Sequence, residues 1–152
     1  MITPISTNIG FEGVTPKEVA VALGLRDKVF CDLGAMAGQF MERCMPFARE
    51  VKGVEKSDQQ AELGRNLELN ITSNDFIKSD LPEADIYYAY QSIENTVSII
   101  KKAMDSDIKK VFVFGAGRPD SRTSIVLEVM GLDKQIVKTH RGDFVLYILD
   151  RR

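Results

Sequence analysis

Short apolar stretches alternate with amphipathic stretches along the whole chain. The apolar stretches are rich in Val, Ile, Phe and Tyr and are bounded by Gly, Pro or Asp, which is typical of buried strands. The amphipathic stretches open on Ser or Thr, which is typical of helix N-caps. This alternation predicts an α/β fold, a three-layer sandwich with a sheet between two layers of helices. We expect strands at 28–33, 51–54, within 71–76, and at 85–90, 110–114, 134–139 and 144–149, and helices at 15–23, from 37 to 46, and at 57–69, 92–104 and 121–130.

Helix starts are marked by two capping-box patterns. Thr15-Pro16-Lys17-Glu18 combines an N-cap threonine, a proline at the first helical position and a glutamate that can reach back to the cap. Ser57-Asp58-Gln59-Gln60 repeats the arrangement with a glutamine. Gly24 and Gly131 are expected to end helices.

The end of the chain departs from the alternation. The expected strands at 134–139 and 144–149 are separated only by a short stretch that contains Arg141-Gly142-Asp143. So short a connection can join antiparallel strands only. The sequence therefore predicts parallel strands followed by a C-terminal antiparallel hairpin, which is not the usual arrangement of a dinucleotide-binding domain.

Composition limits the class of protein. The 152 residues are 44% hydrophobic and 28% charged, which predicts a single globular domain over residues 1–152. No apolar run approaches the roughly 18 residues that span a membrane, and the N-terminus does not resemble a secretory signal, so we expect a cytoplasmic protein. The net charge of −2 disfavours nucleic acid as a partner. Cys31 and Cys44 are expected to be reduced core thiols, and no cluster has the spacing of metal ligands.

The segment 29–39 and the strand that follows it carry the strongest indication of chemistry. A buried strand leads into the small-residue turn Gly34-Ala35-Met36-Ala37-Gly38, and the next strand ends in Glu55. Glu55 lies 21 positions after Gly34 (55 − 34 = 21), a spacing that places an acid at the tip of the neighbouring strand, where it can accept hydrogen bonds from ribose hydroxyls. This pattern predicts a site for an adenosine-containing ligand. A tight strand–helix turn without a ligand is the alternative.

Taken together, these motifs resemble those of the class I, seven-β-strand S-adenosylmethionine (SAM) methyltransferases. The resemblance is carried by Asp32-Leu33-Gly34 and the glycine turn, by Gly53-Val54-Glu55-Lys56, by Asn74-Asp75-Phe76 and by the strand Ala84 to Tyr90. Within that family the order of motifs is nearest to small archaeal and mitochondrial protein-lysine methyltransferases, and more distantly similar to Dot1-like histone-lysine enzymes. The resemblance covers residues 15–104 well and says little about residues 105–152.

The resemblance implies a Rossmann-like seven-stranded sheet whose last strand inserts antiparallel, with SAM as cofactor. It implies that Asp32 binds the ammonium group of SAM, that the glycines allow close approach, that Glu55 binds the ribose and that Asp75 and Phe76 hold the adenine. The implied cofactor-binding residues are Asp32, Gly34, Gly38, Glu55, Asp75 and Phe76. For Asp75 and Phe76, an Asx-turn followed by a core phenylalanine is the alternative.

Met36 departs from the family pattern, which has glycine at this position. A side chain there could narrow the pocket, and a positive φ would cost about 1 kcal/mol. A non-catalytic protein of the same fold, acting as an interaction module, is therefore a rival interpretation.

The resemblance places the methyl acceptor at the end of the fourth strand and implies catalytic roles for Tyr90 and Gln91. An aromatic wall sheds water from an acceptor amine, which lowers its pKa, and a neighbouring amide orients it. The alternative is that these tyrosines are strand residues with one buried face.

We therefore expect a SAM-dependent methyltransferase that acts on an amine, with protein lysine as the favoured acceptor and a protein as the partner. A small-molecule or RNA methyltransferase is the alternative enzyme. An Asn-Pro-Pro-Tyr motif is absent, which disfavours DNA adenine methylation. Exposed strand edges are compatible with a homodimer. No metal is expected.

Overall fold

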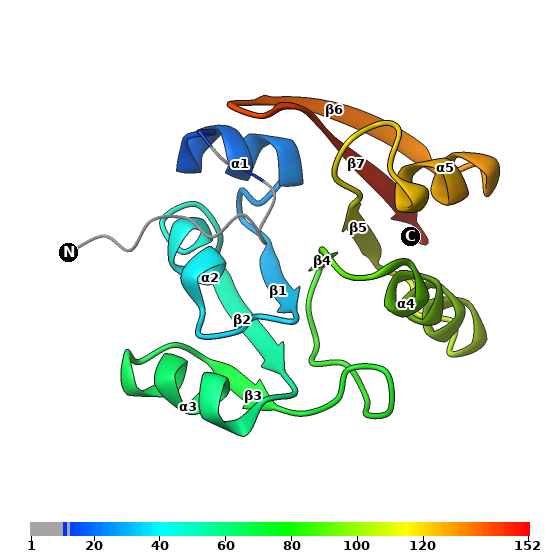
Figure 1. Cartoon of the computed structure of the whole chain (residues 1–152). Helices are drawn as coiled ribbons and strands as arrows, with labels where there is room; N and C mark the ends of the chain where they lie inside the picture. The colour runs from blue at the N-terminus through cyan, green and yellow to red at the C-terminus, as the bar shows by residue number, and fades with distance from the viewer. Residues whose placement is uncertain (1–10, 12) are drawn as a thin grey trace.

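The computed structural model of the chain describes residue 11 and residues 13–152. Seven strands form one sheet in the order β3-β2-β1-β4-β5-β7-β6 (Figure 1). The strands are β1 (Val29–Leu33), β2 (Glu50–Glu55), β3 (Ile71–Ser73), β4 (Ile86–Ala89), β5 (Val111–Gly115), β6 (Asp133–Thr139) and β7 (Gly142–Asp150). The helices are α1 (Pro16–Leu23), α2 (Gln39–Cys44), α3 (Asp58–Asn66), α4 (Ile93–Asp105) and α5 (Arg122–Val129).

Helices cover both faces of this sheet. One buried cluster joins α1, α2 and α3 to the strand side chains that point to their side, and a second cluster joins α4 and α5 to the side chains that point the other way. Alternate residues of one strand enter different clusters, since Tyr88 belongs to the first and Tyr87 to the second. The predicted α/β three-layer sandwich is confirmed.

The direction of the last strands agrees with the prediction from the short connection. Strands β1 to β5 pair in parallel, whereas β7 pairs antiparallel with both β5 and β6. Strand β7 is therefore inserted between β5 and β6 (Figure 1). The C-terminal antiparallel hairpin is confirmed, and the carboxyl ends of β1, β2 and β4 meet at one edge of the sheet.

Local signals set most element boundaries. The Thr15 hydroxyl oxygen accepts a hydrogen bond from the Glu18 amide at 3.2 Å, and α1 ends at Gly24, whose φ of 68° is left-handed. Helix α3 begins after its cap at Ser57 but ends at Asn66, earlier than predicted, because the chain turns through a left-handed Glu68 (φ 65°). Helix α2 ends at Cys44, ahead of Pro46.

An aromatic cluster ties the beginning of the described chain to the sheet. Phe11 is 1% exposed, stacks on Phe40 with ring centroids 5.6 Å apart and meets the Phe144 ring edge-on at 5.0 Å.

Both cysteines are free and buried, and burial raises the pKa of the Cys31 and Cys44 thiols above the ordinary range. Over residues 11 and 13–152, no helix is long and apolar enough to cross a membrane.

Candidate functional site

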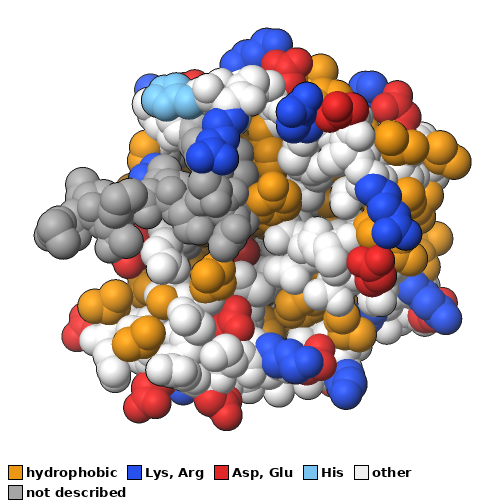
Figure 2. Space-filling view, viewed as in Figure 1, with side chains coloured by type: hydrophobic (Ala, Val, Ile, Leu, Met, Phe, Trp, Pro, Cys, Tyr) orange, Lys and Arg blue, Asp and Glu red, His pale blue; other side chains and the backbone are white. Residues whose placement is uncertain are grey.

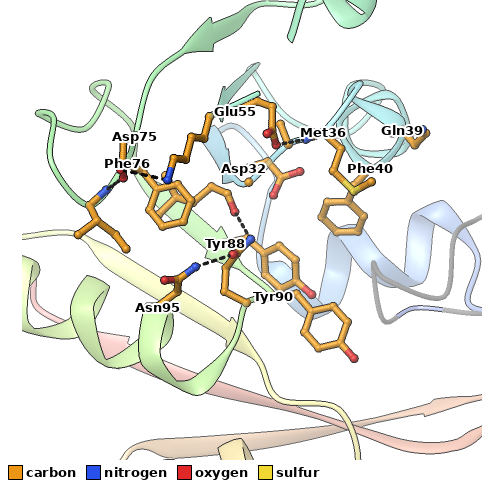
Figure 3. A pocket seen from close by; sticks show the side chains of 16 residues that line it. Asp32, Met36, Gln39, Phe40, Glu55, Asp75, Phe76, Tyr88, Tyr90 and Asn95 are labelled. Atoms are coloured by element: carbon orange, nitrogen blue, oxygen red, sulfur yellow. Dashed lines mark hydrogen bonds and ion pairs between the residues drawn. The ribbon is translucent and has the colours of Figure 1, made fainter. Parts of the chain in front are cut away.

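A cavity of about 260 Å³ opens where β1, β2 and β4 end (Figure 3). The β1–α2 loop, the loop after β3 and the first turn of α4 complete its wall. Its lining residues are Asp32, Leu33, Gly34, Ala35, Met36, Gln39, Phe40, Glu55, Lys56, Asp75, Phe76, Ile77, Tyr88, Tyr90, Gln91 and Asn95. Of the predicted site residues, only Gly38 is not in this wall.

Asp32 is a buried carboxylate at the inner end of the cavity. Its position in β1, paired with Gly53 of β2 and Tyr88 of β4, puts it in the middle of the sheet, and it is 5% exposed. Among the described residues, no hydrogen bond or ion pair reaches its carboxylate. Burial and then the negative charge of Glu55 raise its pKa to about 7. A carboxylate held this way favours a positively charged or hydrogen-bond-donating ligand.

Glu55 ends β2 and is held by two backbone amides. The Met36 amide donates to Oε1 and the Ser57 amide donates to Oε2, each at 2.8 Å. The sequence pattern predicted that Gln60 would complete a capping box with Ser57. Half of this box is present, since the Ser57 hydroxyl accepts from the Gln60 amide at 3.3 Å. The other half is replaced, because Glu55 and not the Gln60 side chain accepts from the Ser57 amide. Glu55 thus links the β1–α2 loop to the start of α3, with lone pairs left for ligand hydroxyls.

The two glycines of the β1–α2 loop serve different purposes. Gly34 has φ 89°, a left-handed conformation that favours glycine, and a Cβ there would lie 2.2 Å from Gln91 Nε2, so a larger residue would displace that side chain. Gly38 has φ 92° and precedes α2, but its free side faces Leu69, which a Cβ would approach to 2.2 Å. Gly38 therefore shapes the loop from behind, whereas Gly34 lines the cavity.

Met36 has a left-handed backbone inside this loop. Its φ is 54°, and the other non-glycine residues with positive φ in the described chain are Asp27, Glu68 and Asp107. Met36 is thus the single apolar residue in this set. Its amide donates to Glu55, a charge-assisted bond that offsets backbone strain of about 1–3 kcal/mol. Figure 3 shows Met36 in the wall of the cavity.

Asp75 and Phe76 lie in a tight turn after β3. Asp75 Oδ1 accepts from the Ile77 amide at 3.0 Å, and Oδ2 lies 3.9 Å from Lys56 Nζ. Phe76 is 7% exposed and packs into the second cluster, yet both residues line the cavity. The Asx-turn that was the alternative interpretation is therefore present together with access to the cavity, and the two interpretations are compatible.

Tyr90, Gln91 and Asn95 form the side of the cavity next to α4. The Tyr90 ring meets Phe144 edge-on, with centroids 5.3 Å apart at 82°. The Asn95 Nδ2 amide donates to Gln91 Oε1 at 3.2 Å, and Gln91 Nε2 lies 3.5 Å from the Leu33 carbonyl. These two hydrogen bonds fix the Gln91 side chain above Gly34.

Sequence reasoning did not identify several lining residues. Asn95 lies one turn into α4, three residues after the cap at Ser92, and nothing in its spacing distinguishes it from a surface residue. Phe40 and Tyr88 belong to the core pattern, and both also line the cavity, with their rings stacked at a centroid distance of 5.0 Å.

Acidic side chains outnumber basic ones in the wall of the cavity. Asp32, Glu55 and Asp75 face the cavity, and Lys56 is the cation among the lining residues. In the described part of the chain, no group of three or more His, Cys, Asp and Glu side chains is placed to hold a metal ion. The wall thus favours an organic ligand with positive charge and hydrogen-bond donors.

Solved structures share this fold. The chain is similar to an RNA methyltransferase from Salinibacter ruber in complex with S-adenosyl-L-homocysteine (TM-score 0.68, 13% identity, 99% of this chain and 95% of that one). A SAM-dependent methyltransferase from Aquifex aeolicus gives TM-score 0.66 with 14% identity over 95% and 93% of the two chains. Ribosomal protein L11 methylase from Lactobacillus delbrueckii subsp. bulgaricus gives 0.65 with 12% identity over 90% and 77%. The chain has the fold of the class I SAM-dependent methyltransferases.

No protein-family model matches the sequence, and no curated protein matches it significantly. The likeness is therefore one of fold. The residues of the cavity must carry any assignment of function.

Proposed function

We propose that this chain is a SAM-dependent methyltransferase that acts on an acceptor amine, with protein lysine as the favoured acceptor. The observation that carries the proposal is Asp32, a buried carboxylate without a partner among the described residues, facing a cavity with two further acids. SAM bears an ammonium and a sulfonium group, and both match an acidic wall.

The donor and acceptor groups fit SAM part by part. Asp32 would accept from the ammonium group and Glu55 from the ribose hydroxyls. Asp75 would accept from the adenine amino group, with Phe76 against the ring. Gly34 would allow close approach of the ligand to the backbone, and Gly38 would act through the shape of the loop. NAD fits less well, because its pyrophosphate would add negative charge beside these carboxylates.

The reaction needs positioning and desolvation from the protein. SAM supplies an electrophilic methyl group on its sulfonium. Tyr90 would wall off water beside an acceptor amine and Gln91 would orient it through its amide, so that a deprotonated amine faces the methyl group. The contacts next to α4 support these two roles. Tyr90 packs on Phe144, and Asn95 donates a hydrogen bond that holds Gln91.

Two alternatives rest on specific observations. The similar proteins include an RNA methyltransferase, so an RNA acceptor is the alternative substrate. On the face seen in Figure 2, Lys and Arg side chains mostly lie among Asp and Glu side chains, which favours a protein acceptor over RNA. Met36 favours the other alternative, a non-catalytic protein in which this side chain keeps SAM out.

Calorimetric titration of the full chain with SAM, S-adenosylhomocysteine and NAD tests the cofactor. We expect SAM to bind and NAD not to bind. Absence of SAM binding would overturn the proposal, and tight NAD binding would favour a dinucleotide enzyme.

Radiolabelled methyl transfer from SAM into cell lysate tests the acceptor. We expect label in protein that survives nuclease treatment and is recovered as methyl-lysine after hydrolysis. Label confined to RNA would contradict the lysine proposal while leaving the methyltransferase proposal intact. Sedimentation of the purified chain tests the homodimer that exposed strand edges would permit.

A further inference from the structure

The turn that carries Asp75 and Phe76 lies in an unusual connection. No helix crosses over between β3 and β4, and residues 74–85 instead run as a loop. The loop begins with one compact turn, in which the Lys78 and Ser79 amides donate to the Asp75 carbonyl at 3.1 and 2.9 Å. A parallel crossover normally gains its rigidity from a packed helix, so this turn needs support from elsewhere.

Lys102 provides that support from the last turn of α4. Its ammonium donates to the Ile77 carbonyl at 3.2 Å and also to the Ser79 carbonyl. Among the described residues, Lys102 forms no ion pair with a carboxylate, and no other group donates to these two carbonyls. The partly buried ammonium therefore satisfies the two carbonyls of the turn. Within the same turn, Asp75 Oδ1 accepts from the Ile77 amide.

We propose that Lys102 is a positioning residue that sets the adenine end of the cofactor site by holding the turn 75–79. The inference rests on the proposed SAM function. A charged donor shared by two carbonyls fixes the turn more strongly than neutral hydrogen bonds would. The ordering cost that a mobile turn would add to ligand binding is thereby removed before the ligand arrives.

The rest of the loop has its own anchors, so the role of Lys102 is local. The Tyr87 hydroxyl donates to the Pro82 carbonyl, and Lys52 Nζ donates to the Glu83 carbonyl at 2.6 Å. These contacts hold the part of the loop that leads into β4. Loss of Lys102 should therefore loosen the turn 75–79 without releasing the remainder of the loop.

Hydrogen exchange of the ligand-free protein tests the anchor directly. We expect Lys102→Met to speed exchange of the Lys78 and Ser79 amides about tenfold, because the turn opens more often. Lys101→Met is the matched control, since Lys101 is the exposed neighbour on the same helix. Lys102→Arg, which keeps a charged donor, should restore most of the protection.

Binding of adenosine and inosine tests the consequence for the site. Inosine lacks the amino group that would donate a hydrogen bond to Asp75, so the wild type should bind adenosine more tightly than inosine. We expect Lys102→Met to weaken SAM and adenosine binding about tenfold and to narrow the preference over inosine, with Lys101→Met unchanged. A loss of general stability alone would lower the melting temperature and leave this preference unaltered.

The outcomes separate the two proposals. If the wild type binds SAM and adenosine but Lys102→Met keeps the same affinities and preference, the role of Lys102 is wrong and the methyltransferase proposal stands. If the wild type binds neither ligand, the proposed function fails, and the positioning role fails with it. Unchanged exchange of the Lys78 and Ser79 amides would refute the anchor itself.

Discussion

Asp85 and Asp32 are carboxylates at opposite ends of neighbouring strands, and they differ in their partners and in their pKa. Asp85 precedes β4 and accepts the Val29 amide at 2.8 Å, with Arg49 at 3.9 Å. The Val29 hydrogen bond and the neighbouring cations hold the pKa of Asp85 below its ordinary value. Asp32 sits near the other end of β1 without such partners, and burial raises its pKa to about 7.

The contrast separates an end of the sheet where an acid adds stability from the end where we propose that a ligand binds. At the amino end, the acid satisfies a backbone amide and stabilises the junction of β1 and β4. At the carboxyl end, the buried acid costs folding free energy that a cationic ligand can recover. A group that destabilises the fold and faces a cavity is a sign of function.

Replacement of the two aspartates should affect SAM binding to very different extents. Asp32→Asn removes the charge that would meet the ammonium group, so we expect SAM affinity to fall about 100-fold or more. Asp85→Asn is the matched control and should leave SAM affinity within about twofold, because it lies at the far end of the sheet. Calorimetry on both folded variants measures the difference. Equal loss in both variants would remove the distinction between the two ends.

The same substitution should raise the stability of the ligand-free protein. The folded-state pKa of Asp32 lies above its value of 3.8 in the unfolded chain, so folding binds a proton between these two pKa values. Ionisation of Asp32 therefore costs no stability below pH 3.8, and its cost grows as the pH rises until it is complete above about pH 7. We expect the gain of Asp32→Asn over the wild type to increase by on the order of 4 kcal/mol between pH 4 and pH 8.

Urea unfolding across that pH range measures this gain. The difference between variant and wild type should grow up to about pH 7 and then level off. A constant difference at all pH values would mean that Asp32 keeps an ordinary pKa in the folded protein.

Tyr90 tests whether the wall next to α4 acts in methyl transfer. Tyr90→Ala opens the site to water, and we expect methyl transfer into lysate protein to fall about tenfold or more, with SAM affinity nearly unchanged. Tyr90→Phe keeps the ring against Phe144 and should retain most of the activity. If both variants keep full activity, the acceptor docks elsewhere.

Met36 should give the smallest effect. Met36→Gly relieves a left-handed backbone but adds freedom to the unfolded chain, so we expect stability to change by less than about 1 kcal/mol. SAM affinity should rise by a few-fold, roughly 2–5, if the side chain narrows the cavity. Glu68→Gly is the matched control, because Glu68 has a similar φ of 65° outside the cavity. Weaker SAM binding by Met36→Gly would instead identify Met36 as a ligand contact.

Much of the fold follows from local pattern. The cap at Thr15, the glycine after α1 and the short connection before Gly142 each act on a few neighbouring residues, and the structure agrees with all three. The predicted end of α3 was too late, because nothing local shows that Leu67 leaves the helix and Glu68 turns left-handed. Insertion of β7 between β5 and β6 was expected from the family resemblance, not from the residues themselves.

The site was predictable only in part. Glu55 could be located because an acid at the end of one strand meets the turn after its neighbour at one edge of a parallel sheet. Asp32 and Asp75 were expected from the family resemblance. Gly38 was assigned to the cofactor by motif, but its direction depends on Leu69, a contact far along the chain. Lys102 acts across the gap between α4 and the turn after β3, so no local pattern marks it. Asn95 bonds Gln91 only four residues earlier, but its place in the cavity wall depends on how the start of α4 lies against β1 and β4.

The sequence by itself determined the order and type of the elements and the presence of acids at the strand ends, because caps, glycines and apolar runs act over one or two turns of chain. Only the tertiary structure decided how these acids differ. Burial leaves Asp32 without a partner among the described residues, Glu55 gains the Met36 and Ser57 amides, and Asp85 gains the Val29 amide. Solvation and long-range hydrogen bonding set the energy of a charge, and both exist only once the sheet has formed.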